Sequence, residues 1–308
     1  MSAHLKTLTV IAPVYNEANI IADFYNALKK ELLLEKEYNA TILLVVDPGK
    51  DNTITVLKKL SANDARLQVI TLSRRFGHQS SLIAGLDYAN ADAVVMLDAD
   101  LQHPPEVIHD LLRGFEAGFD IVQTVRLKTE NIGVLKNMSS RLYYFLINKL
   151  SDTPVRPAAA DFRLMSRRLV DVIRTNFKER NMFLRGVIGW IGYRTKYVEF
   201  RAPNRSAGES KYTFIRLLRL GLAGVVAFSR KPLRLAFSFG LALFLFGIIG
   251  GLVLVVILPS WFSVLAALVA IIGGIQLLFL GVIGEYIGAV FDEVKARPLY
   301  LVDEKINF

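Results

Sequence analysis

Two long runs without a charged residue lie near the carboxyl end, and they most constrain how this chain can fold. Residues 235–258 contain no charge, and residues 264–284 have only Gln276 as a strongly polar interruption. A helix of about 20 apolar residues is long enough to cross the hydrocarbon core of a bilayer. Residues 259–263 between the runs are typical of a turn and leave no room for a folded domain. The pattern predicts a transmembrane hairpin, and a pair of buried core helices is the alternative.

Positive charges flank the predicted hairpin on both sides and are absent from its turn. Cytoplasmic segments next to membrane spans are enriched in Lys and Arg, so both flanks are expected in the cytosol. The apolar stretch at residues 8–14 is too short for a secretory signal, so the amino-terminal half is expected there too. We therefore predict a multi-pass protein of the cytoplasmic membrane with both termini cytosolic. The flanking cations are Arg230, Lys231 and Arg234 before the runs, and Lys295, Arg297 and Lys305 after them.

The composition narrows the classes of partner and of site. Hydrophobic residues make up 53% of the chain and the mean hydropathy is +0.37, which is high for a soluble enzyme. The net charge of +9 favours anionic lipid, phosphorylated substrates or nucleic acid as partners. No nucleic-acid recognition module is recognisable, so nucleic acid is not expected. The absence of cysteine excludes disulfides, thiolate metal sites and a cysteine nucleophile.

Short apolar runs alternate with amphipathic stretches before the hairpin, which is typical of an α/β domain with a mainly parallel sheet. Ligands of such sheets bind beyond the carboxyl ends of the strands. The residues after each strand, at 13–17, 47–51, 73–77 and 98–102, are therefore the candidate site. Strands are predicted at residues 8–12, 40–46, 67–72, 93–97 and 121–125, and helices at residues 20–32, 56–60, 80–88 and 107–115.

Two carboxylates follow the predicted strand at residues 93–97. Asp98 and Asp100 are two residues apart, so in extended chain both side chains lie on one side. Carboxylate oxygens suit Mg²⁺ or Mn²⁺, which can neutralise a departing diphosphate. A solvated acidic turn is the alternative, because Asp-x-Asp alone is a common pattern. The rest of the sequence favours the metal.

The chain contains six motifs that are informative together. They are Pro13-Val14-Tyr15-Asn16-Glu17, Leu72-Ser73-Arg74-Arg75-Phe76-Gly77, Ala84-Gly85-Leu86-Asp87, Asp98-Ala99-Asp100-Leu101-Gln102-His103-Pro104-Pro105-Glu106, Asp161-Phe162-Arg163-Leu164-Met165-Ser166 and Gly208-Glu209-Ser210-Lys211-Tyr212. These motifs resemble the family-2 glycosyltransferases and, more narrowly, polyprenyl-phosphate glycosyltransferases of the dolichol-phosphate mannose synthase type. The two predicted spans are similar to the bacterial branch that loads glucose or related sugars onto undecaprenyl phosphate, and the resemblance extends from about Leu8 to Val302.

The resemblance implies a fold, an organisation and a reaction. The fold would be a GT-A-like nucleotide-sugar-binding α/β domain over residues 1–210. A juxtamembrane amphipathic helix at 211–232, the two spans at 233–291 and a cytosolic tail at 292–308 would follow. The reaction would be inverting transfer of a hexose, with glucose favoured, from a UDP-sugar to undecaprenyl phosphate. The product would be a polyprenyl-monophosphate-linked sugar, the cofactor Mg²⁺ or Mn²⁺, and a homo-oligomer is compatible with this picture.

The resemblance also implies a role for individual residues. Asp98 would lie on the ribose or metal side, Asp100 would be the main metal ligand, and Gln102 and Asp161 would line the sugar and the reaction centre. Guanidinium groups pair well with phosphate, although a solvated surface role is the alternative for each cation, as surface packing is for Tyr15. The residues around the nucleotide base would be Pro13, Tyr15, Glu17 and Asp47, and the phosphate-binding candidates are Arg126, Arg201, Arg205 and Lys211.

Asp161 is the candidate catalytic base by the resemblance, and a capping carboxylate in a turn is the alternative. The acceptor phosphate has a second pKa near 6, so it is already largely ionised at cytosolic pH. A strong base is then unnecessary. We expect Asp161 mainly to orient a neighbouring group, such as Arg163 or the sugar hydroxyls.

Three positions depart from the family pattern. Pro48 replaces a second acidic residue after Asp47, His103 stands where Asp is frequent, and Met182 stands where Arg is expected. The first puts the ribose pose and the choice of base in doubt. Neither His103 nor Met182 removes a required ligand, and the contact of Asp47 with the base is expected to survive.

Two amphipathic stretches, at residues 143–150 and 214–222, are expected to lie in the headgroup plane, with core packing as the alternative. Two rival functions remain open. An inactive nucleotide-sugar-binding scaffold would lose metal or sugar residues that this chain retains. A processive polysaccharide synthase would carry more spans and a Gln-x-x-Arg-Trp motif, which is absent.

Overall fold

The structure is a computed structural model, and it describes residues 5–127, 159–179, 182–201, 238 and 261–308. The chain divides into two compact units. One comprises Met1–Ser140, Val155–Lys211 and Pro298–Phe308, and it holds the sheet; the other comprises Arg141–Pro154 and Tyr212–Arg297. The last eleven residues therefore belong to the same unit as the amino-terminal half.

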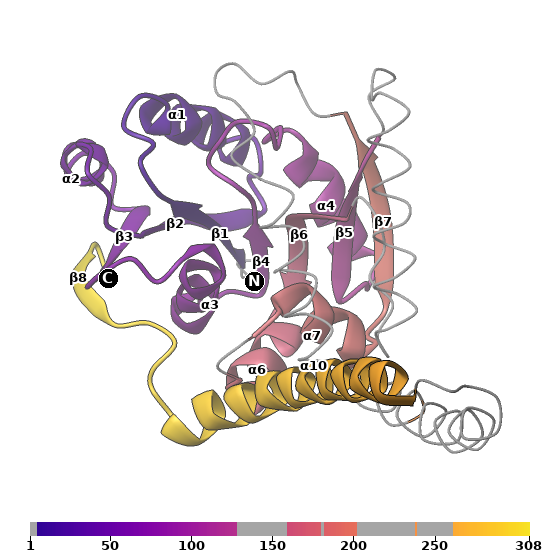
Figure 1. Ribbon diagram of the computed structural model, residues 1–308. Helices are drawn as coiled ribbons and strands as arrows, with labels where there is room; N and C mark the ends of the chain where they lie inside the picture. Colours follow the sequence, from indigo (N-terminus) through magenta and orange to yellow (C-terminus); the bar gives the residue numbers. More distant parts are fainter. Residues whose placement is uncertain (1–4, 128–158, 180–181, 202–237, 239–260) are drawn as a thin grey trace. The chain divides into compact units, whose positions relative to one another are not determined.

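An eight-stranded sheet with the order β7-β5-β6-β4-β1-β2-β3-β8 organises the first unit (Figure 1). The pairs β1·β2, β1·β4, β2·β3 and β5·β7 are parallel, and β4·β6, β5·β6 and β3·β8 are antiparallel. The predicted α/β domain with a mainly parallel sheet is thus confirmed. The strands are β1 (Lys6–Val14), β2 (Tyr38–Val46), β3 (Leu67–Leu72), β4 (Ala93–Met96), β5 (Ile121–Arg126), β6 (Ala159–Ser166), β7 (Thr195–Phe200) and β8 (Val302–Ile306).

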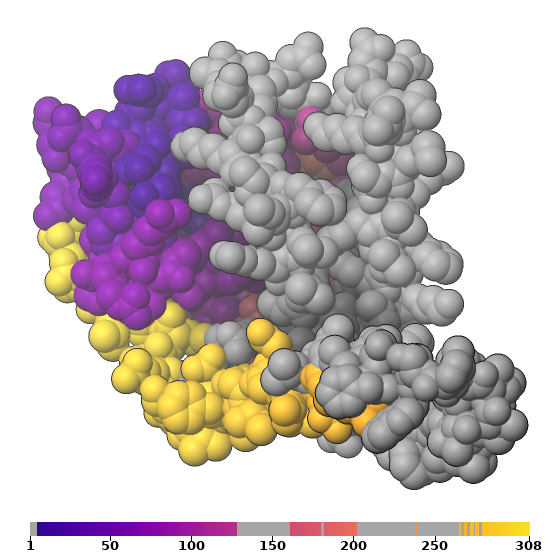
Figure 2. Space-filling view, viewed as in Figure 1, coloured from indigo at the N-terminus to yellow at the C-terminus, as the bar shows by residue number. Residues whose placement is uncertain are grey.

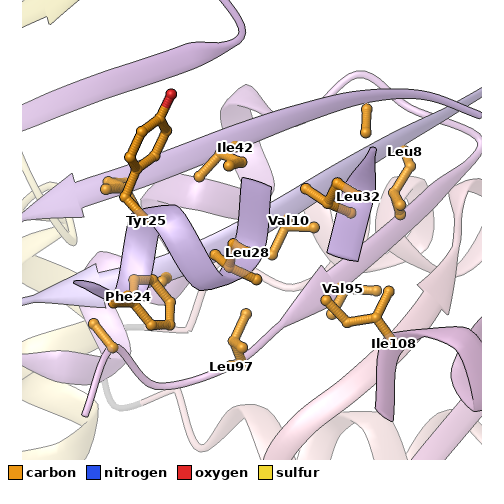
Figure 3. Packing of buried hydrophobic residues seen from close by; sticks show 14 of the residues in the cluster. Leu8, Val10, Phe24, Tyr25, Leu28, Leu32, Ile42, Val95, Leu97 and Ile108 are labelled. Carbon is orange, nitrogen blue, oxygen red and sulfur yellow. The ribbon is translucent and has the colours of Figure 1, made fainter. Parts of the chain in front are cut away.

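Helices cover both faces of this sheet. Alternate residues of a strand point to opposite faces, and β1 shows the consequence. Leu8 and Val10 are buried in one cluster with Phe24 and Leu28 of α1 (Figure 3). Ile11, which follows Val10 and therefore points to the other side of the strand, faces α3 instead. The helices of this unit are α1 (Ile21–Leu32), α2 (Thr53–Ser61), α3 (His78–Tyr88), α4 (Val107–Glu116), α6 (Arg167–Asn176) and α7 (Leu184–Ile191).

The glycine of the Ala84-Gly85-Leu86-Asp87 motif has a packing role. A Cβ atom at Gly85 would lie 2.4 Å from Cγ2 of Ile11, which is closer than any real contact. The absent side chain lets α3 pack tightly on β1 and β2. This matters for the site, because α3 begins at the carboxyl edge of the sheet.

All five predicted strands are present, but three strands were not predicted. β6 and β7 carry no clear alternation of apolar and polar residues. β8 has the sequence Val-Asp-Glu-Lys-Ile and is an edge strand with its three central residues exposed. An edge strand of this kind needs little apolar surface, so hydropathy does not reveal it.

The second predicted span lies in α10 (Trp261–Lys295), a helix of 35 residues in the second unit. In the part of the chain that the structure describes, no helix combines the length and the apolarity that a bilayer crossing requires. The first span, residues 235–258, lies outside the described residues apart from Ser238, as do both amphipathic stretches. The crossing itself stays a prediction.

Candidate functional site

The carboxyl ends of three parallel strands meet at one edge of the sheet and bring the predicted site together. Ala12 of β1 is in register with Leu44 of β2, and Ile11 is in register with Met96, the last residue of β4. The polar segments at 13–17, 47–51 and 98–102 therefore leave the sheet side by side. This is the arrangement expected for a ligand site in a parallel α/β sheet.

Hydrogen bonds join the loops after β1 and β2. Asn16 has a positive φ of 55°, and its Oδ1 accepts from the backbone N–H of Lys50 at 3.0 Å. A Cβ atom at Gly49 would lie 1.8 Å from that Oδ1, so a larger residue there would displace the Asn16 side chain. Thr53 Oγ1 accepts from the backbone N–H of Glu17 at 3.0 Å. The loop at Pro48-Gly49, where the sequence departs from the family pattern, is thus packed closely against the loop after β1.

Asp47 is buried and engages the next loop, residues 73–77, which we call the β3–α3 loop. Its Oδ1 accepts from the backbone N–H of Phe76 at 2.7 Å, and its Oδ2 accepts from that of Gly77 at 2.9 Å. Both carboxylate oxygens therefore hold protein backbone. The structure shows a loop-fixing role for Asp47, while its predicted contact with the base stays a prediction.

Tyr15 is covered by an arginine of the same loop. The guanidinium carbon of Arg75 lies 4.0 Å from the centroid of the Tyr15 ring. One face of the ring thus makes a cation–π contact, which is worth about 0.5–1 kcal/mol at an exposed site. A base that stacks on Tyr15, as the resemblance implies, would use the other face or displace Arg75.

Asp161, on β6, is the most strongly held carboxylate of the site. Arg185, in the first turn of α7, donates from Nε to Oδ1 and from Nη2 to Oδ2, each at 2.7 Å. Arg163 Nη2 donates to Oδ1 at 3.0 Å. Burial would raise the pKa of Asp161, but the nearby His78 and the hydrogen bonds from Arg185 hold it well below its usual range. The expected contact with Arg163 is confirmed, and Asp161 is fully ionised.

His78 stands between two carboxylates of the site. Its Nε2 lies 3.6 Å from Oδ1 of Asp98 and 3.6 Å from Oδ2 of Asp161. Burial lowers the pKa of His78, but the contact with Asp161 and the charge of Asp98 outweigh this effect and raise it. The sequence reasoning did not single out this residue. Its position directly after Gly77, at the start of α3, was the available signal.

His103 is a structural residue. The backbone N–H of Asp98 donates to its Nδ1 at 2.9 Å, so Nδ1 carries no proton in this bond. The ring packs against Phe162 and Phe200 with centroids at 5.3 and 5.9 Å. Burial lowers the pKa of His103, in agreement with a neutral ring. His103, at a position where Asp is frequent in the family, therefore holds the backbone at Asp98 in place.

Asp100 and Gln102 form the start of a polar chain at the same edge. Asp100 Oδ1 accepts from the backbone N–H of Gln102 at 3.0 Å. Gln102 Oε1 accepts from Nη1 of Arg126 at 3.4 Å. Arg126 ends β5 and is exposed, and Arg201 is exposed directly after the neighbouring strand β7. Arg205 and Lys211 lie outside the described residues.

The carboxylates fit a divalent cation in part. Oδ1 of Asp98 is buried and makes no hydrogen bond among the described residues, and its contact with His78 Nε2 is a longer one of 3.6 Å, so a cation could compete for it. Burial raises the pKa of Asp98, and a bound cation would offset that cost. No group of three or more His, Cys, Asp or Glu ligands occurs in the described ranges. Asp98 and Asp100 could hold Mg²⁺ or Mn²⁺ only if phosphate oxygens and water complete the shell, as Mg²⁺ sites commonly allow.

Met182, where Arg is expected, is a buried apolar residue that precedes α7. The arginine three positions later, Arg185, is the one that reaches Asp161. The sequence pattern did not identify Arg185 as a site residue, although it lies three residues after Met182, where the family pattern has Arg.

Two family models match the chain. The model described as Glycosyl transferase family 2 matches residues 9–174, and the one described as GtrB C-terminal hairpin matches residues 231–290. The Uncharacterized glycosyltransferase YkcC of Bacillus subtilis (strain 168) is 37% identical over 311 residues, with 99% of this chain and 95% of that protein covered.

A second relative has a more specific name. The SfII prophage-derived bactoprenol glucosyl transferase of Shigella flexneri is 37% identical over 302 residues, with 96% of this chain and 97% of that protein covered. Among solved structures, the mannosyltransferase PcManGT from Pyrobaculum calidifontis in complex with GDP-Man and Mn²⁺ has a TM-score of 0.46 and 16% identity, with 95% of this chain and 87% of that chain covered. Similarity at that level carries no argument about individual residues.

Proposed function

Because the chain belongs to glycosyl transferase family 2, we propose that it transfers a hexose from a nucleotide diphosphate sugar to the phosphate of a polyprenyl lipid. The observation that carries this proposal is the polar cluster of Asp98, His78, Asp161 and Arg185 beyond the parallel strands. The full-length relatives named as bactoprenol glucosyl transferases support a polyprenyl phosphate as the acceptor and glucose as the sugar. UDP-glucose is the donor that we favour.

The reaction that we propose is a single displacement. An oxygen of the lipid phosphate forms a bond to the anomeric carbon, and the bond from that carbon to the nucleotide diphosphate breaks. The leaving diphosphate takes the electron pair, and the anomeric configuration is inverted. Because a phosphomonoester has a second pKa near 6, the attacking oxygen needs no proton removed at neutral pH. The product carries one phosphate between lipid and sugar.

The residues of this chain would bind and orient the reactants. Asp161 is ionised and paired with two arginines, so it is too weak a base to remove a proton. It would instead hold Arg185, whose guanidinium is partly exposed, toward a phosphate group. Arg126 and Arg201 are further exposed guanidinium groups for the two phosphates. Asp98 and Asp100 would hold a divalent cation, which would stabilise charge on the leaving diphosphate.

A transfer assay with a panel of donor sugars tests this proposal. We expect the purified full-length protein in detergent, given undecaprenyl phosphate and labelled UDP- or GDP-sugars, to carry label from UDP-glucose into the organic phase. Omission of the lipid phosphate should abolish that label. Label that stays in the aqueous phase with every donor would contradict the proposal. Lipid products with several sugars would indicate a processive enzyme.

We further propose that residues 233–291 form a membrane hairpin of the cytoplasmic membrane, with the catalytic unit and both termini in the cytosol. The match of residues 231–290 to a carboxy-terminal hairpin family supports this placement. The connectivity supports it too, because Pro298–Phe308 returns to the unit that contains the amino-terminal half. A segment whose two ends join one folded unit must cross the bilayer an even number of times.

A labelling experiment tests the orientation. We expect cysteine at position 260 (Ser260→Cys), in the predicted turn, to react with an impermeant maleimide added outside intact cells. The variant Ser2→Cys should react only after permeabilisation. The chain has no cysteine of its own, so each variant carries a single label site. The reverse labelling pattern would overturn the orientation.

A further inference from the structure

The last strand, β8, pairs with the strand that leads into the β3–α3 loop. β8 pairs antiparallel with β3, and the pairing continues past the strand, because the backbone N–H of Ser73 donates to the carbonyl of Leu301 at 2.9 Å. The yellow strand β8 lies beside β3 in Figure 1, and its atoms pack against the violet residues in Figure 2. Ser73 is the first residue of the β3–α3 loop.

A second contact holds α3, the helix that follows that loop, near its carboxyl end. The hydroxyl of Tyr300 donates to Oδ2 of Asp87 at 2.7 Å. Asp87 lies near the end of α3, the helix that begins at His78 directly after the loop. Leu301 and Tyr300 are adjacent, so two neighbouring residues of the chain end hold both elements that the loop connects. This contact also gives the Asp of the Ala84-Gly85-Leu86-Asp87 motif a partner.

The loop between these two contacts shapes the donor site. Its residues Phe76 and Gly77 donate to Asp47, and its Arg75 covers Tyr15. His78, which follows the loop, lies between Asp98 and Asp161. A displacement of β3 relative to α3 would therefore move groups that face the nucleotide. Such a displacement should weaken binding of the nucleotide donor.

We propose that the carboxy-terminal segment Pro298–Phe308 is a positioning element of the donor site and that Tyr300 is its positioning residue. This inference rests on the proposed function, because it assigns a role toward the nucleotide donor. The segment follows α10 directly, and only residues 296–299 separate Lys295, the last residue of α10, from Tyr300. The donor site is thereby tied through the chain to the end of the predicted hairpin.

The same segment offers a matched control at its far end. Nδ2 of Asn307 donates to the carbonyls of Ser61, Asp64 and Leu67 at 2.8, 3.3 and 2.9 Å. These groups lie where β3 begins, at the opposite end of the strand from the β3–α3 loop. Loss of the Asn307 contacts should weaken the attachment of the segment without acting on the loop.

The test uses three full-length variants, Tyr300→Phe, Asp87→Ala and Asn307→Ala. We expect Tyr300→Phe to raise the dissociation constant of UDP, measured by calorimetry, and the KM for the sugar donor by about tenfold, because hydrogen bonds to charged groups are among the stronger ones. The value of kcat should change by less than about twofold, since groups that act only in the transition state are untouched. Asp87→Ala should give the same shift in Kd, and the double variant should add nothing further.

The control variant Asn307→Ala shows whether weaker UDP binding in Tyr300→Phe comes from a displaced loop or from a general loss of stability. Asn307→Ala should lower Tm but leave the dissociation constant of UDP within about twofold of wild type. The inference is wrong if Tyr300→Phe binds UDP as wild type does, or if Asn307→Ala weakens UDP binding equally at a similar loss in Tm. Wild-type protein that binds neither UDP nor GDP would overturn the proposed function together with this inference.

Discussion

Asp161→Asn is expected to reduce transfer at saturating donor by about 100-fold or more, because Arg185 loses its bidentate partner and moves from its place. UDP binding should persist, since Asp161 bonds to arginines and not to the loops after β1 and β2, where we expect the nucleotide. The same change should lower the free energy of unfolding by about 3 kcal/mol, because it leaves Arg163, 2% exposed, without its carboxylate. Initial rates, UDP calorimetry and thermal melts measure the three effects.

The pH profile separates orientation from base catalysis. The pKa of Asp161 is depressed, so its stabilising contribution is complete above the unfolded pKa of about 3.9 and is lost only in stronger acid. Between pH 5 and 8 we therefore expect the wild-type rate to follow ionisation of the lipid phosphate, near pH 6. A separate carboxylate limb that disappears in Asp161→Asn would make Asp161 a true base.

A matched control is Asp171→Asn on α6. Asp171 also faces an arginine, Arg174, at 3.6 Å, but Asp171 is exposed and Arg174 is only half-buried. Exposed pairs contribute about 0–1 kcal/mol, so this variant should keep both activity and stability. Wild-type turnover in Asp161→Asn would remove Asp161 from the site altogether.

Asp100→Asn is expected to abolish transfer, by about 1000-fold or more, because the cation that Asp98 and Asp100 would hold supplies several kcal/mol of charge stabilisation. An asparagine Oδ1 can still accept the backbone N–H of Gln102, so the fold should be unchanged. Wild-type protein in excess EDTA should lose activity and regain it with Mg²⁺ or Mn²⁺. Direct Mn²⁺ binding, measured by electron paramagnetic resonance, should weaken in the variant.

Asp110→Asn is the control for this experiment, because Asp110 is an exposed carboxylate on α4 that pairs with Arg113 of the same helix. It should retain both activity and Mn²⁺ binding. Full activity of Asp100→Asn, or of wild type in excess EDTA, would contradict a metal site at these carboxylates.

The parallel half of the fold and its site could be predicted because the signals are local. Apolar runs such as residues 8–12 and 93–97 mark buried strands, and in a parallel sheet their polar successors must meet at one edge. Asp98 and Asp100 were found in this way. The expected contact of Asp161 with Arg163 was also local, since the two residues are two apart on one face of β6.

Contacts between distant elements could not be predicted in the same way. The pair Asp161–Arg185 joins β6 to α7, and it depends on the antiparallel insertion of β6 between β4 and β5. No local pattern encodes that insertion. The hydrogen bonds from the backbone N–H groups of Phe76 and Gly77 to Asp47 could not be predicted either. The sequence shows that a carboxylate is present at position 47, but not which donors it contacts. β8 was not predicted because the sequence of a charged edge strand resembles that of a solvated tail.

The mass and anomeric configuration of the lipid product test the central claim most directly. Wild-type protein with undecaprenyl phosphate and α-linked UDP-glucose should yield one hexose on the lipid monophosphate, in β configuration by NMR. Release of UDP should equal the product formed. A lipid diphosphate sugar, an α-linked product, or UDP release without a glycosylated lipid would contradict inverting transfer to a polyprenyl phosphate.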